Sequence, residues 1–164
     1  MRIIYFILLV PCLLFGQQPV PGQVSQSIAI PDSEGTYALY LPRTFDASKE
    51  YPAVFIFDPD GKGAQAAQQF VIAAELTGSI VLAPNLKIEA LTEAVKFSEQ
   101  FVNTMFDQWS IDRDQIFLTG RLDGAVLASS SAQLSSIISG VIAVGDVYVD
   151  RRFMSDKNGF KLVI

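Results

Sequence analysis

The sequence predicts an α/β fold, with a mostly parallel sheet and helices on both of its faces. Short unbroken apolar segments recur along the chain, and such segments are typical of strands that are buried on both faces. Stretches rich in helix-forming residues separate them, at the spacing of right-handed strand–helix–strand crossovers. Half of the 164 residues are hydrophobic and 18% are charged. A packed core is therefore expected, and a disordered chain is excluded.

An antiparallel pair of strands is expected to precede the parallel units. Residues 24–30 and 36–41 are two strand candidates, and the turn-forming cluster Pro31-Asp32-Ser33-Glu34-Gly35 separates them. Residues 18–35 are then an extended N-terminal segment and the first strand.

The parallel units follow in regular alternation. We expect buried strands at 53–57, 79–83, 115–119 and 140–145, helices at 64–77, 88–109 and 125–134, and a further strand at 160–164. Asp112-Arg113-Asp114 is expected to be a turn between the longest helix and the strand that follows it. No helix follows the strand at 160–164, so the domain is expected to be incomplete at its C-terminus.

The first 17 residues have the layout of a secretory signal peptide. Arg2 supplies a positive charge, an apolar stretch follows it, and the chain turns polar at Gly16-Gln17. The apolar stretch is shorter than the ~20 residues that a membrane-spanning helix needs. A short N-terminal membrane anchor is the alternative. We expect a secreted or periplasmic protein that has no membrane association after signal cleavage.

The charge and residue counts exclude several classes of function. The net charge is −5, which repels the phosphate backbone of nucleic acids. The 164 residues include no histidine, the commonest general base, and one cysteine, too few for an internal disulfide or a Cys-rich zinc site. Asp58, Asp60 and Asp123 follow strands and are candidate calcium ligands, but their spacing matches no EF-hand. We expect no nucleic-acid partner, no cofactor and no metal.

One motif carries a specific signal. Gly120-Arg121-Leu122-Asp123-Gly124 lies between a predicted strand and a predicted helix. This is the position and glycine spacing of the nucleophile elbow, Gly-x-Ser-x-Gly, of α/β-hydrolases. The central residue here is Leu122, which has no lone pair with which to attack a carbonyl carbon.

From about Tyr37 to Ile164 the chain resembles secreted α/β-hydrolases of the esterase and polyester-depolymerase type. The matching segments are 37–42, 51–57, 81–85 and 111–120, together with the degenerate elbow. The resemblance implies that residues 36–164 form a partial α/β-hydrolase-like domain.

The same resemblance implies the roles of the site residues. The backbone N–H of Asp123 is one oxyanion donor, and the loop after Phe57, with Asp58, Asp60 and Gly61, is the equivalent of the loop that supplies the other. Pro59 in that loop has no N–H to donate. The family's acid and base lie after later strands, beyond Ile164, so no catalytic residue is assigned within this chain.

Two functions follow from these observations. The first is a catalytically inactive hydrolase-fold protein with a binding or scaffold role, whose partner is an unknown ligand or a missing C-terminal region. The second is the N-terminal part of a secreted carboxylic-ester hydrolase whose acid and base lie beyond this chain. Leu122 favours the first, because no extension of the chain restores a hydroxyl there. The serines at 129–131 are expected to be small packing residues of a helix.

Overall fold

The computed structural model describes residues 18–87, 89–144 and 161–163. The predicted signal peptide, residues 1–17, and the segment 145–160 lie outside the described residues, so the signal peptide remains a prediction.

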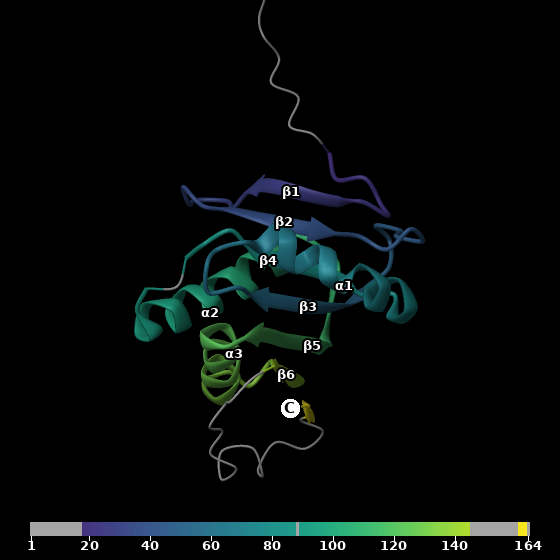
Figure 1. Cartoon of the computed structure of the whole chain (residues 1–164). Helices are drawn as coiled ribbons and strands as arrows, with labels where there is room; N and C mark the ends of the chain where they lie inside the picture. Colours follow the sequence, from purple (N-terminus) through teal and green to yellow (C-terminus); the bar gives the residue numbers. More distant parts are fainter. Residues whose placement is uncertain (1–17, 88, 145–160, 164) are drawn as a thin grey trace, which may run out of the picture.

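Among the described residues, seven strands form one sheet in the order β1-β2-β4-β3-β5-β6-β7 (Figure 1). The strands are β1 (Val24–Ala29), β2 (Thr36–Tyr40), β3 (Tyr51–Phe57), β4 (Ile80–Pro84), β5 (Ile111–Arg121), β6 (Gly140–Val144) and β7 (Lys161–Val163). Strand β2 pairs antiparallel with both β1 and β4, and all the other pairs are parallel. The predicted hairpin, the mostly parallel sheet and the strand near the end of the chain are therefore confirmed.

Helices cover both faces of the sheet, as predicted. They are α1 (Gly63–Thr77), α2 (Leu91–Gln108) and α3 (Asp123–Leu134). Helix α1 packs on one face through Ala66, Ala67 and Ala74, and α2 and α3 pack on the other. Gly78 ends α1 in the left-handed conformation, with φ of 66°, and its N–H donates to the carbonyl of Ala74.

The prediction of a turn at Asp112-Arg113-Asp114 is wrong, because these residues lie inside β5. The strand is irregular there. Tyr51 of β3 pairs with Ile111, and Ala53, two residues further on, pairs with Ile116, so residues 112–115 bulge out of the ladder. Within the bulge, the Asp112 carboxylate accepts the Asp114 N–H at 2.9 Å, a turn-like bond inside a strand. The turn-forming residues act locally, while pairing with β3 continues on both sides of them.

The edge strand β1 carries a second irregularity. Its pairing with β2 shifts between Ser25 and Ile28, where β1 has one extra residue. The carbonyl of Gln26, inside this shift, accepts a hydrogen bond from the side chain of Asn85 at 2.9 Å.

Aromatic residues fill the core between the sheet and α2. The Phe101 ring is buried and lies within 6 Å, centroid to centroid, of the rings of Tyr37, Phe55 and Phe97. Trp109, which follows α2, donates its indole N–H to the Tyr37 hydroxyl at 3.0 Å. These contacts fix α2 against the strands that end at the candidate site.

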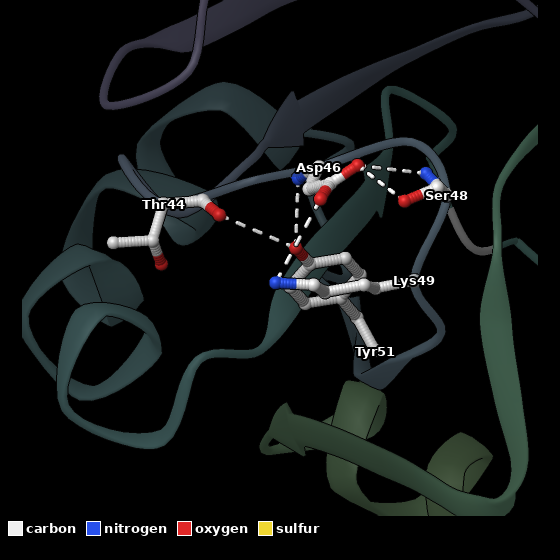
Figure 2. Close-up of polar contacts among 5 residues, drawn as sticks. All are labelled: Thr44, Asp46, Ser48, Lys49 and Tyr51. Atoms are coloured by element: carbon white, nitrogen blue, oxygen red, sulfur yellow. Dashed lines mark hydrogen bonds and ion pairs between the residues drawn. The ribbon is translucent and has the colours of Figure 1, made fainter.

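Polar contacts brace the loop before β3 (Figure 2). The hydroxyl of Tyr51 accepts the Asp46 N–H at 2.7 Å and donates to the Thr44 carbonyl at 3.3 Å. The Asp46 carboxylate accepts two hydrogen bonds from Ser48 and lies 3.7 Å from the Lys49 ammonium. The Ser48 hydrogen bonds lower the pKa of the Asp46 carboxyl.

A second polar contact ties α1 to β2. The Glu75 carboxylate accepts hydrogen bonds from the Tyr40 hydroxyl at 2.5 Å and from the Arg43 backbone N–H at 2.7 Å. Burial, together with the neighbouring Glu75 charge, raises the pKa of Tyr40 to about 12. The same hydrogen bond lowers the pKa of the Glu75 carboxyl. Glu75, the single charged residue of α1, is therefore bound both to β2 and to the loop that follows it.

Candidate functional site

The backbone at Leu122 adopts a strained conformation between β5 and α3. Its φ is 53° and its ψ is −122°, in a region that residues other than glycine rarely occupy. The carbonyl of Leu122 accepts the N–H groups of Ala125 and Val126, so this residue also begins the helix. Its side chain is 60% exposed. The turn therefore presents a leucine side chain to solvent at the end of β5.

Both glycines of the motif are required by close packing. A Cβ atom on Gly120 would overlap the backbone of Gly124, four residues further along the chain. A Cβ atom on Gly124 would overlap the carbonyl oxygen of Phe57, at the end of β3. The two glycines thus allow α3 to begin directly against the ends of β5 and β3, which is the geometry of a nucleophile elbow.

The loop after β3 uses its own N–H groups internally. The Asp58 carboxylate accepts the N–H groups of Asp60 at 3.0 Å and Lys62 at 3.1 Å, and the Asp58 carbonyl accepts the Gly61 N–H at 3.1 Å. Pro59 has no N–H. The backbone N–H groups of residues 59–62 are therefore absent or bound within the loop, so these four positions offer no second oxyanion donor in this arrangement.

A cavity of about 190 Å³ lies between this loop, the start of α1 and the end of β5. The structure brings Asp58 and Asp60 together with Gly120 and Arg121 around it. Four residues that the sequence also places at the site are not part of its lining: Gly61, Leu122, Asp123 and Gly124. Sequence reasoning missed the residues that α1 contributes, Gln65, Gln69 and Phe70. The helical spacing was the available signal, because positions 65 and 69 are four residues apart and share one face of α1.

The charges at this cavity are paired with one another. The Lys62 ammonium lies 3.0 Å from the Asp60 carboxylate. The hydrogen bond from Lys62, together with its positive charge, lowers the pKa of the Asp60 carboxyl. The positive charges of Arg121 and Lys87 lower this pKa further. The cavity therefore carries nearby charges of both signs.

The three aspartates considered as calcium ligands do not form a cluster. Within residues 18–87 and 89–144, no group of three or more carboxylate, cysteine or histidine side chains is placed to hold a metal ion. The serines at 129–131 lie in α3. Ser129 and Ser131 are buried, and Ser131 shares a hydrogen bond of 2.6 Å with Ser98 of α2, which is a packing role.

We compared the sequence and the structure of this chain with those of known proteins. No family model matches the sequence, and no curated protein matches it. Solved structures do match. An esterase of the archaeon Pyrobaculum calidifontis superposes with a TM-score of 0.58 at 20% identity, over 76% of this chain and 45% of that chain. Acetyl xylan esterase of Aspergillus awamori gives 0.61 at 17% identity, over 84% of this chain and 56% of that chain. A thermophilic carboxylesterase from a metagenomic library gives 0.58 at 16% identity, over 77% and 47%.

The chain has an α/β-hydrolase fold. It spans about half the length of these esterases. Within this fold, Gly120 to Gly124 form the turn from β5 into α3, and the loop from Asp58 to Gly63 follows β3 beside it.

Proposed function

We propose that this protein is a catalytically inactive relative of the esterases, and that it acts as a binding or scaffold module. Leu122 carries this proposal: it occupies the strained, exposed apex of the elbow and has no nucleophilic atom. The elbow lies inside the chain, so sequence beyond either end does not change the residue at that position.

The loop after β3 supports the same proposal. The N–H groups of residues 60–62 are bound to Asp58, and the Asp60 carboxylate places a negative charge beside the cavity. A developing oxyanion needs free N–H donors and is repelled by a neighbouring carboxylate. The alternative is that the chain is the N-terminal part of a secreted carboxylic-ester hydrolase whose acid and base lie beyond Ile164.

A fluorophosphonate probe tests the loss of catalysis. We expect no labelling of the purified chain, and no hydrolysis of a short-chain aryl ester above the rate in buffer. Leu122→Ser is expected to remain unlabelled, because an unactivated serine is a weak nucleophile and the 164 residues contain no histidine. Leu122→Ala is the matched control for labelling elsewhere.

Three outcomes separate the two functions. Labelling of the unmodified chain at any serine overturns the inactive function. Labelling of Leu122→Ser alone shows that the elbow is competent and that another group serves as the base. Ester hydrolysis by a longer natural form of the chain supports the alternative.

We further propose that the protein is exported and processed near Gln17. The apolar segment led by Arg2 supports this proposal. None of the helices within the described parts of the chain is both long and apolar enough to cross a membrane. Mass spectrometry of the exported protein is expected to find an N-terminus between about Gln17 and Val20. Soluble material that retains Met1 would contradict export with cleavage.

A further inference from the structure

We draw no further inference here: the strongest candidate, the cavity between the loop after β3, the start of α1 and the end of β5, belongs to the site already described, its Asp60 and Lys62 side chains pair with each other, and nothing in the structure shows what covers it.

Discussion

Gly124→Ala is expected to destabilise the protein by about 3 kcal/mol or more, the upper range for overpacking a close contact. The added Cβ would overlap the carbonyl oxygen of Phe57. That oxygen belongs to the backbone at the end of β3, so neither it nor the start of α3 can move aside as a flexible side chain would. Urea unfolding of the variant measures the loss as a lower midpoint at an unchanged slope.

Gly78→Ala is the control for this substitution. Gly78, unlike Gly124, has a positive φ, of 66°, and a Cβ atom there would meet nothing within 4 Å. Gly78→Ala should therefore lower the free energy of unfolding only by the cost of a positive φ for a residue with a Cβ atom, about 1 kcal/mol. Equal losses in the two variants would mean that α3 does not pack against β3 as closely as the structure shows.

Leu122→Gly is expected to stabilise the protein by about 1–3 kcal/mol, the strain of holding an ordinary residue in a sparsely populated backbone region. The Leu122 side chain is 60% exposed, so little packing is lost when it is removed. A rise in the urea midpoint is the expected result. It would show that the elbow is strained even though no nucleophile uses the strain.

Asp32→Gly is the matched control for the strain. Asp32 is the other described residue, besides glycines, with a positive φ, of 55°. Aspartate tolerates the left-handed region better than leucine does, so the gain at Asp32 should be smaller. A drop in stability on Leu122→Gly would indicate that the leucine side chain itself holds the elbow in place.

The elements of the fold could be predicted because their signals are local. The apolar segments of β3, β4 and β6 and the glycine after α1 are visible in a short window of sequence. The bulge in β5 at residues 112–115 could not be predicted, since it depends on which residues of β3 lie opposite. Turn-forming residues indicated the irregularity but not that pairing resumes around it.

The candidate site was predictable to the same extent. The spacing of Gly120 and Gly124 predicted a tight strand-to-helix turn, because both positions need a residue without a side chain. The internal bonding of the loop to Asp58 was not predicted, since it depends on how the loop folds back on one carboxylate. The hollow between α1 and strands β5 and β6 depends on which face of the sheet each crossover takes, and no short segment of sequence contains that information.

The irregular pairing of β1 has a consequence for how the molecule behaves at high concentration. An edge strand with a regular row of free N–H and C=O groups is a template for another strand, and repeated addition gives fibrils. In β1 the extra residue between Ser25 and Ile28 breaks that row, and the Gln26 carbonyl is already bound by Asn85. A foreign strand therefore finds no regular ladder along the whole of β1, which disfavours growth of the sheet past this edge.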